Sequence, residues 1–291
     1  NTLLLPRLNY GGRPFKRAWS ASDVITDNQY RASTPQTAQA TISIGGFATR
    51  YRIDGDLVED SAIPLVSTLG KQIAMDLSSA YEDCMLNGDS DGSHQDAIAT
   101  WDPRGRWAGG TFSAGNDHRE VFNGLRKQAF ARSGEYSLGN AALTSDKLIA
   151  TISLMGEFAS EGRVLITGPE MLISQFMSLS QVLTVDAFGP QATIKGGEIA
   201  SIFGIPIVLS RFITADMATS GLYTGSGSTS GFVIANTNSY KHYQKQGISV
   251  EVDKQITSGA VDIVSSLRRT FDTPDTATAK NVAYGYNSID L

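Results

Sequence analysis

Residues 61–88, SAIPLVSTLGKQIAMDLSSAYEDCMLNG, are the stretch that decides the fold. Apolar residues recur in it at intervals of three and four, at Leu65, Leu69, Ile73, Leu77, Tyr81 and Met85. This spacing puts one apolar stripe on one face of a helix, while polar residues fill the other face. Pro64 suits a first helical turn, and Asn87-Gly88 is a typical C-terminal stop. We therefore expect an amphipathic helix on the order of 35 Å long, enough to cross a whole domain.

The composition of the chain excludes several classes of protein. Its 291 residues suffice for one large or two modest domains, and a net charge of −5 is not that of a nucleic-acid-binding protein as a whole. The single cysteine, Cys84, excludes an internal disulfide framework and is expected to be a small buried core residue. The most apolar run, residues 202–209, is too short to span a membrane.

The first 22 residues differ in character from the rest. They contain Arg7, Arg13, Lys16 and Arg17 but no acidic residue, with glycines, prolines and scattered apolar residues between them. This composition does not indicate a core element. We expect a basic, extended arm that lies against another surface.

Residues 31–56 have a period near two, which is typical of strands. Two β-prone runs, residues 41–44 and 47–53, flank Gly45-Gly46. A Gly-Gly pair between such runs is a hairpin signal. The expected hairpin is polar on both faces, and an isolated two-stranded ribbon is only marginally stable in water. It should therefore rest on a neighbour.

The rest of the chain mixes helices and strands without strict alternation, which indicates an α+β fold. We expect helices at residues 116–132, 145–160 and 169–179. We expect strands at residues 163–167, two runs within 198–213, and 231–235, 248–252, 261–271 and 280–286, with a flexible loop at 219–231.

Signals of catalysis are weak. His94, His118 and His242 are far apart and in no metal-ligand spacing, so surface or loop positions are expected for each. No serine lies in a GxSxG motif, and the Gly-rich loop at 225–231 lacks the Lys-Ser/Thr pair of a P-loop. We expect no catalytic residue and no cofactor.

One turn resembles the start of a calcium loop. Asn87, Asp89 and Asp91 occupy positions 1, 3 and 5, and Gly92 follows at position 6. The twelfth position, which should supply a bidentate Glu, is Ile98. The simpler interpretation is a polar turn that caps the long helix, with a metal ion as the alternative.

The order of the segments resembles that of one protein family. Several stretches are similar to successive parts of the major capsid proteins of tailed double-stranded DNA phages. These are "YRIDGDLVEDSAIPLV" leading into "AYEDCMLNGD", "DKLIATISLMGEFASEGRVLITGPEMLISQF", "GGEIASIFGIPIVLSRFI", "GFVIANTNSYKHYQKQGISVEV" and "VDIVSSLRRTF". That fold, the Hong Kong phage capsid fold, is shared with encapsulins. The resemblance covers most of the chain from about residue 50, and the order of the motifs carries it more than any one of them.

The resemblance implies a division into five parts. These are an N-terminal arm (1–30), an extended hairpin or E-loop (31–56), a peripheral domain with the long spine helix (57–135), an axial domain (136–245) and the return strands of the peripheral domain (246–291).

The resemblance also implies a function and partners. The chain would assemble with itself into pentamers and hexamers of an icosahedral head that encloses double-stranded DNA, in a virion assembled in the bacterial cytoplasm. Portal, scaffold or protease, and a decoration protein, are further implied partners; a membrane is not. Candidate contacts between subunits or with DNA are Arg7, Arg13, Lys16, Arg17, Arg50, Arg52, Glu59 and Asp60.

The chain departs from the family pattern in one respect. Some members link subunits through a Lys–Asn bond, but residues 31–56 contain no lysine, so such a linkage is not expected. The first residue is Asn, from which we expect cleavage of a precursor near this point. Two alternatives remain: an encapsulin-type compartment, and a soluble enzyme with an unrecognised site.

Overall fold

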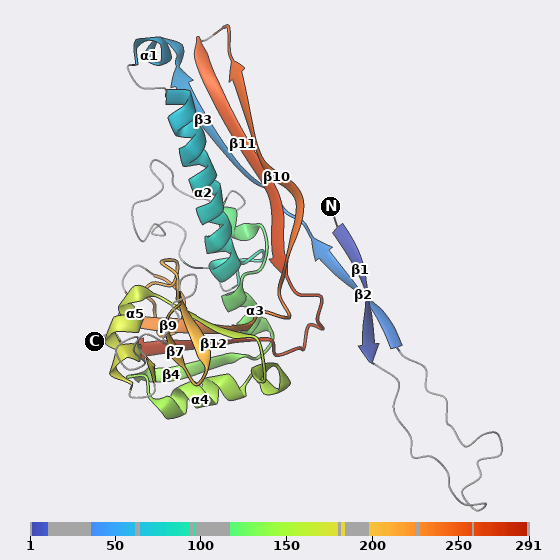
Figure 1. Ribbon diagram of the computed structural model, residues 1–291, viewed down its shortest axis with the longest axis vertical. Helices are drawn as coiled ribbons and strands as arrows, with labels where there is room; N and C mark the ends of the chain where they lie inside the picture. Colours follow the sequence, from blue (N-terminus) through green and yellow to red (C-terminus); the bar gives the residue numbers. More distant parts are fainter. Residues whose placement is uncertain are drawn as a thin grey trace, which may run out of the picture.

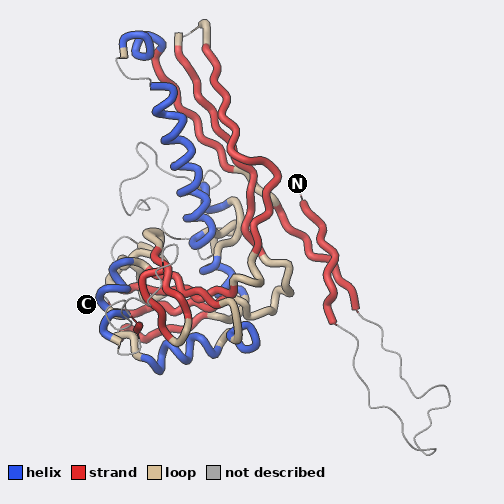
Figure 2. The backbone as a smooth tube through the Cα atoms, in the orientation of Figure 1, coloured by secondary structure: helices blue, strands red, loops and turns tan. Residues whose placement is uncertain are grey.

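The computed structural model describes residues 2–10, 36–61, 65–93, 96, 117–179, 182–183, 198–224, 227–257 and 259–289. Figure 1 shows three parts: a long upright beam, a rounded body below it, and a two-stranded ribbon that projects to one side. Each part has its own sheet, with three strands in the beam, seven in the body and two in the ribbon. Figure 2 shows that helices gather in the beam and on the body, while the ribbon is strand alone.

The beam consists of helix α2 (Leu65–Asn87) packed on a three-stranded sheet in the order β10-β11-β3. The strands are β10 (Lys241–Lys254), β11 (Ala260–Asp272) and β3 (Phe47–Asp54), all antiparallel to their neighbours. A short helix, α1 (Gly55–Asp60), lies at the far end. The long amphipathic helix is thus confirmed, and its apolar stripe lies against the returning strand β11, as expected.

The apolar stripe of α2 explains its place on this sheet. Ile73 and Leu77 are buried against Ile53 of β3 and Ile263 of β11 in one continuous core. A polar contact adds to the apolar ones, since the Tyr51 hydroxyl of β3 donates to an Asp76 carboxylate oxygen of α2 at 2.7 Å. Burial and this carboxylate raise the pKa of Tyr51 to about 12.

The ribbon is formed by β1 (Thr2–Tyr10) and β2 (Gln36–Ser43), paired antiparallel with Thr2 opposite Ser43. The hairpin predicted at Gly45-Gly46 is therefore wrong, because β2 pairs with β1 whereas β3 pairs with β11. Neither glycine has the positive φ that a tight hairpin turn requires. Gly45 instead permits close packing, since a Cβ there would lie 2.3 Å from Val121 Cγ1.

This pairing changes the expected division of the N-terminal region. The first strand of the ribbon lies within the expected arm and the second within the expected hairpin, so the boundary at residue 30 divides a single element. Lys16 lies in sequence between the two strands, so the lack of lysine in residues 31–56 no longer argues against a covalent link. Arg13, Lys16 and Arg17 themselves lie outside the described residues.

The body contains a mixed sheet in the order β4-β12-β9-β5-β8-β7-β6. Its strands are β4 (Glu135–Ala141), β5 (Arg163–Thr167), β6 (Val182–Leu183), β7 (Glu198–Ile202), β8 (Ile205–Leu209), β9 (Thr229–Asn236) and β12 (Val282–Ile289). The last strand therefore belongs to the body, which corrects the expectation that residues 246–291 all return to the beam. Every residue of the central strand β9 is buried, because both faces of the sheet are covered.

Helices cover one face of the body sheet, and the end of the beam covers the other. On one face lie α4 (Ser145–Ser153), the turn η4 (Gly156–Ala159), α5 (Pro169–Ser174) and the turn η5 (Phe176–Ser178), around a core that includes Phe176 and Phe232. On the other face lies α3 (Leu125–Ala131), in one core with the end of α2. The beam and the body therefore share a hydrophobic core.

Three local predictions need correction. The helix expected at 116–132 is a turn η3 (His118–Glu120) followed by the short α3, because Gly124 packs against the end of α2, where a Cβ would lie 2.6 Å from the Gly88 nitrogen. The helix expected at 145–160 ends at Ser153, and Gly156 follows with φ +53°. The loop expected to be flexible at 219–231 contains buried Tyr223 and the start of β9.

Candidate interaction surfaces

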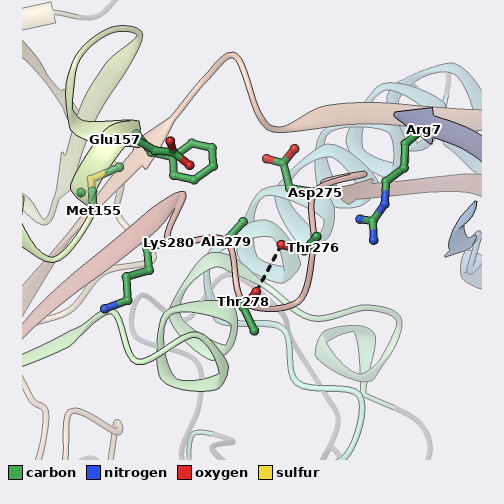
Figure 3. Close-up of a pocket in the computed structure, with 10 residues that line it drawn as sticks. Arg7, Met155, Glu157, Asp275, Thr276, Thr278, Ala279 and Lys280 are labelled. Carbon is green, nitrogen blue, oxygen red and sulfur yellow. Dashed lines mark hydrogen bonds between the residues drawn. The ribbon is translucent and has the colours of Figure 1, made fainter. Parts of the chain in front are cut away.

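Arg7 anchors the ribbon to the rest of the molecule. Its guanidinium donates to the Pro274 carbonyl oxygen at 2.7 Å, in the connection between β11 and β12. Figure 3 shows Arg7 at one side of a pocket of about 640 Å³, with Glu157 of η4 and Asp275 also on its wall. The pocket thus lies where the ribbon, the body and the return connection meet.

Arg50 and Arg52 lie on β3, on the sheet face away from α2. Arg50 pairs with Asp262 of β11 at 2.6 Å, and the Arg52 Nε lies 4.0 Å from the same carboxylate. The hydrogen bond from Arg50 holds the pKa of Asp262 below its usual value, although partial burial opposes this. The two arginines, which we expected to contact acids of a neighbour, therefore already have an acidic partner within the chain. Arg52 also donates to the Gln255 amide oxygen at 2.8 Å, and both arginine side chains are about half exposed.

Glu59 and Asp60 lie on α1 at the far end of the beam, and both are exposed. The helix begins against the β10–β11 turn, since a Cβ on Gly55 would lie 2.2 Å from the Gly259 carbonyl oxygen. The acids and the two arginines of β3 are thus spread along one elongated element. No enclosed site brings them together.

The oxygen atoms of the calcium-like turn are bonded to positively charged side chains of the same chain. The Lys127 ammonium lies 3.2 Å from Asp89 and 2.6 Å from Asp91, and Arg126 donates to the Asn87 amide oxygen at 2.7 Å. A dication would have to displace these groups from the same oxygens. Among the described residues there is no group of three or more His, Cys, Asp or Glu placed to hold a metal ion. The turn therefore holds ion pairs with Lys127.

These contacts belong to a larger buried cluster, here called the joint, which connects α2 to the body. Its members are Asp83, Asn87, Asp89, Asp96, Asp117, His118, Arg119, Arg126 and Lys127. At its centre Arg126 pairs with Asp96 at 2.8 Å and 3.0 Å. The same guanidinium donates to the Gly221 carbonyl oxygen and lies 5.3 Å from the centroid of the Tyr284 ring of β12. One side chain thus connects the end of the beam with the body.

A second set of contacts in the joint centres on Asp117. Its carboxylate accepts three hydrogen bonds from the Arg119 side chain at 2.6–3.1 Å, and both side chains are fully buried. Beside it, His118 lies between two carboxylates, with Nε2 2.7 Å from Asp83 and Nδ1 3.3 Å from Asp117.

The histidine predictions differ in outcome. His118 lies in the joint with its side chain only 12% exposed, so the surface position expected for it is wrong. His242 of β10 is exposed, as expected, and its ring packs on Tyr81 and Phe271, with Nδ1 2.7 Å from the Tyr81 hydroxyl. His94 lies outside the described residues. The calcium-like pattern singled out Asn87 and Asp89, but no pattern predicted the joint as a cluster, because its members come from segments that are far apart in the chain.

The joint has the chemistry of a structural connection. Its charged groups are paired with one another at short distance, and they do not line the pocket of Figure 3. Cys84, at the base of α2, is fully buried, and burial raises the pKa of its thiol, so it is not a reactive thiolate. No helix in the described part of the chain has the length and apolarity needed to cross a membrane.

The comparisons with known proteins agree with one another. A model described as the phage capsid family matches residues 12–268. No curated protein sequence matches the chain significantly.

Several solved structures have a similar fold. The capsid of a native GTA particle has 16% identity and a TM-score of 0.60, over 99% of this chain and 85% of that one. Microbacterium phage Oxtober96 has 10% identity and a TM-score of 0.63, over 99% and 86%. The holo-SrpI encapsulin complex from Synechococcus elongatus has 12% identity and a TM-score of 0.57, over 88% and 79%. At these identities the structural matches show the fold alone.

Proposed function

Because the chain belongs to the phage capsid family, we propose that its ribbon and its beam are the surfaces through which copies of it form pentamers and hexamers of an icosahedral head. It is a major capsid protein, a structural component of the virion that assembles with itself, and it is not an enzyme. The fold is the Hong Kong phage capsid fold.

The structure of the ribbon is the main support for this proposal. Among the described strands, β1 and β2 pair only with each other, and a two-stranded ribbon is marginal in water without further packing. One of its faces exposes Leu4, and Arg7, towards the Tyr10 end of β1, donates to the Pro274 carbonyl oxygen. A ribbon that projects to one side of the beam and the body is suited to lie over an adjacent subunit (Figure 1).

The charged residues have a secondary role in this proposal. Arg50, Arg52, Glu59 and Asp60 contribute contacts between neighbouring beams, and exposed pairs of this kind contribute at most about 1 kcal/mol each, so many must act together. Arg13, Lys16 and Arg17 contribute positive charge for contacts with acidic neighbours or with packaged DNA. The DNA contact is non-specific, because it depends on charge alone.

The proposal also includes the place of assembly and the other proteins that take part in it. Shells form in the bacterial cytoplasm with a portal and a scaffold or protease, and a decoration protein joins some of them.

Removal of residues 1–22 tests the role of the ribbon. The variant loses all of β1, so we expect soluble subunits whose far-ultraviolet circular dichroism retains the signal of beam and body. We expect it to form few or no shells by size-exclusion chromatography and negative-stain microscopy. The full chain, prepared in parallel, is the control. Truncated subunits that form shells of unchanged thermal stability would contradict the proposal.

The encapsulin-like neighbour supports one other candidate, a protein compartment that holds cargo. The content of purified shells decides between the two. Nuclease-protected double-stranded DNA inside the shell indicates the phage head, whereas a cargo protein without DNA indicates the compartment.

A further inference from the structure

His118 is the member of the joint whose charge changes most readily near neutral pH, because the other members are carboxylates, an amide, arginines and a lysine. It lies in η3, which packs on the end of α2. Its Nε2 lies 2.7 Å from an oxygen of Asp83 in α2, and its Nδ1 lies 3.3 Å from an oxygen of Asp117. Both carboxylates are fully buried, so the ring stands between two buried negative charges.

A neutral imidazole does not match this position. It has one N–H, so one of its two nitrogens presents a lone pair. With the proton on Nε2, the lone pair of Nδ1 faces Asp117; with the proton on Nδ1, the lone pair of Nε2 faces Asp83. Repulsion between a lone pair and a carboxylate oxygen is strong in a buried site. The doubly protonated ring has an N–H at each nitrogen and therefore matches both carboxylates.

The charges of the joint favour the same form of the ring. The described joint contains four buried carboxylates and three permanent cations, which are Asp83, Asp89, Asp96 and Asp117, and Arg119, Arg126 and Lys127. Each of these cations pairs with one carboxylate, at 2.6–3.2 Å. Asp83 accepts a hydrogen bond from the neutral Asn87 amide at 2.7 Å and faces His118. A protonated His118 supplies a fourth positive charge.

The elements around His118 carry further titratable groups, and these keep their charge near neutral pH. Cys84 of α2 is fully buried, and burial raises the pKa of its thiol, so it stays neutral. In the turn after α2, the hydrogen bond from Lys127 holds the pKa of Asp91 below its usual value. Glu120 of η3 and the carboxylates, arginines and lysine of the joint ordinarily stay charged between pH 6 and pH 8.5.

We propose that His118 is a pH-dependent latch in the joint, which in its doubly protonated form holds the end of α2 to η3. When the ring releases its proton to solvent, the buried charge of Asp83 loses its paired cation and this contact opens. The apolar core that the beam and the body share stays intact, so the change is local. The stabilisation is present at low pH and is lost as the pH rises through the titration of His118.

The consequence for a shell rests on the proposed function. The joint connects the beam to the body, and an open latch lets their relative angle vary (Figure 1). Closed shells require this angle to stay within narrow limits in every copy. We therefore expect closed shells to form better at pH 6 than at pH 8.5.

Urea denaturation of the isolated subunit tests the latch. The full-length chain with His242→Phe serves as the reference, because the titration of His242 has the opposite sign. We expect its unfolding midpoint to fall by about 0.5 M urea between pH 6 and pH 8.5. His118→Gln in this background should lower the midpoint at pH 6 and remove the slope. Asp83→Asn, which removes the charge that requires the proton, should also remove the slope and is the second variant if His118→Gln does not fold.

Nitrogen-15 NMR of histidine-labelled subunits with the native His242 observes the ring directly. We expect His118 to stay doubly protonated at a pH at which His242 is already neutral, since burial and the charge of Arg269 lower the pKa of His242. Asp83→Asn should bring the two titrations closer together. The latch is wrong if His118 loses its proton together with His242 or before it. Equal slopes in urea for His118→Gln and the reference would also overturn it.

Shell formation distinguishes a failure of the latch from a failure of the proposed function. In the reference chain we expect the shell yield to fall from pH 6 to pH 8.5, and in Asp83→Asn we expect equal yields at the two values. If His118 titrates as expected but the yield of the reference does not change, the consequence for the shell is wrong and the latch stands. If no shells form at either pH while the urea slope is present, the proposed function fails and the latch stands.

Discussion

Asp117 and Arg119 show how much a single buried pair contributes at the joint. Both side chains are fully buried, and three hydrogen bonds connect them. Removal of one partner leaves an uncompensated buried charge, which typically costs about 3–5 kcal/mol. We expect Asp117→Ala to lower the free energy of unfolding of the isolated subunit by that amount in urea denaturation. Asp91→Ala removes a mostly exposed partner of Lys127 and should change it little. Equal effects of the two changes would contradict this account.

The same carboxylate has a predictable pH dependence. Burial raises the pKa of Asp117, but the hydrogen bonds and charge of Arg119 outweigh burial and hold it below the ordinary value of 3.8. A lowered folded-state pKa stabilises the protein above the unfolded-state value, and this contribution is lost as the pH falls below 3.8 through the folded-state pKa. Asp117→Asn should therefore show a smaller loss of unfolding midpoint between pH 5 and pH 3 than the parent protein.

His242 has the opposite titration. Burial, with the charge of Arg269, lowers its pKa below 6.5, so the unfolded chain binds the proton more readily. In a chain that carries His118→Gln, the unfolding midpoint in urea should fall from pH 7.5 to pH 5.5 as this proton is taken up. His242→Phe, which keeps a ring against Tyr81 and Phe271, should remove part of that slope. Parallel curves for variant and parent would refute the assignment.

At the scale of elements, the two faces of α2 differ in how much they contribute to the stability of the subunit. Ile73 is fully buried in the core of the beam, whereas Met75, two residues later, is more than half exposed. Truncation of a buried aliphatic side chain costs about 2–5 kcal/mol, while an exposed one usually changes stability by less than about 0.5 kcal/mol. We expect Ile73→Ala to lower the free energy of unfolding strongly and Met75→Ala to leave it almost unchanged, as measured by urea denaturation. A Met75→Ala variant that loses shells but keeps subunit stability would indicate a subunit contact on this outer face.

At the scale of the molecule, the ribbon is joined to the body by the contact of Arg7 with the Pro274 carbonyl. Arg7→Met keeps an apolar stem at this position and removes the donor. We expect faster hydrogen exchange of the backbone amides of β1 and β2 in the isolated subunit, with exchange in β5 and β9 unchanged. Unchanged exchange in the ribbon would show that β1–β2 pairing alone holds it.

The sequence by itself determined the features that depend on local pattern. The apolar residues of α2 recur every three or four positions, so this helix must bury one face whatever element it packs against. The apolar patterns of β5 and β11 likewise predict strands from the local sequence alone. The order of these segments was enough to identify the family, because a fold preserves the order of its elements even where the residues diverge.

Only the tertiary structure decided which strands pair and where the charges meet. Gly45-Gly46 resembles a turn in sequence, but Gly45 serves close packing against Val121, and the partner of β2 is a strand whose pairing begins more than thirty residues earlier, at Thr2. The joint combines Asp83, Asp96 and Arg126 from three segments, and Arg126 also contacts the Tyr284 ring of β12. Strand pairing and ion pairs of this kind depend on distances between segments remote in the chain, and local sequence patterns contain no information about those distances.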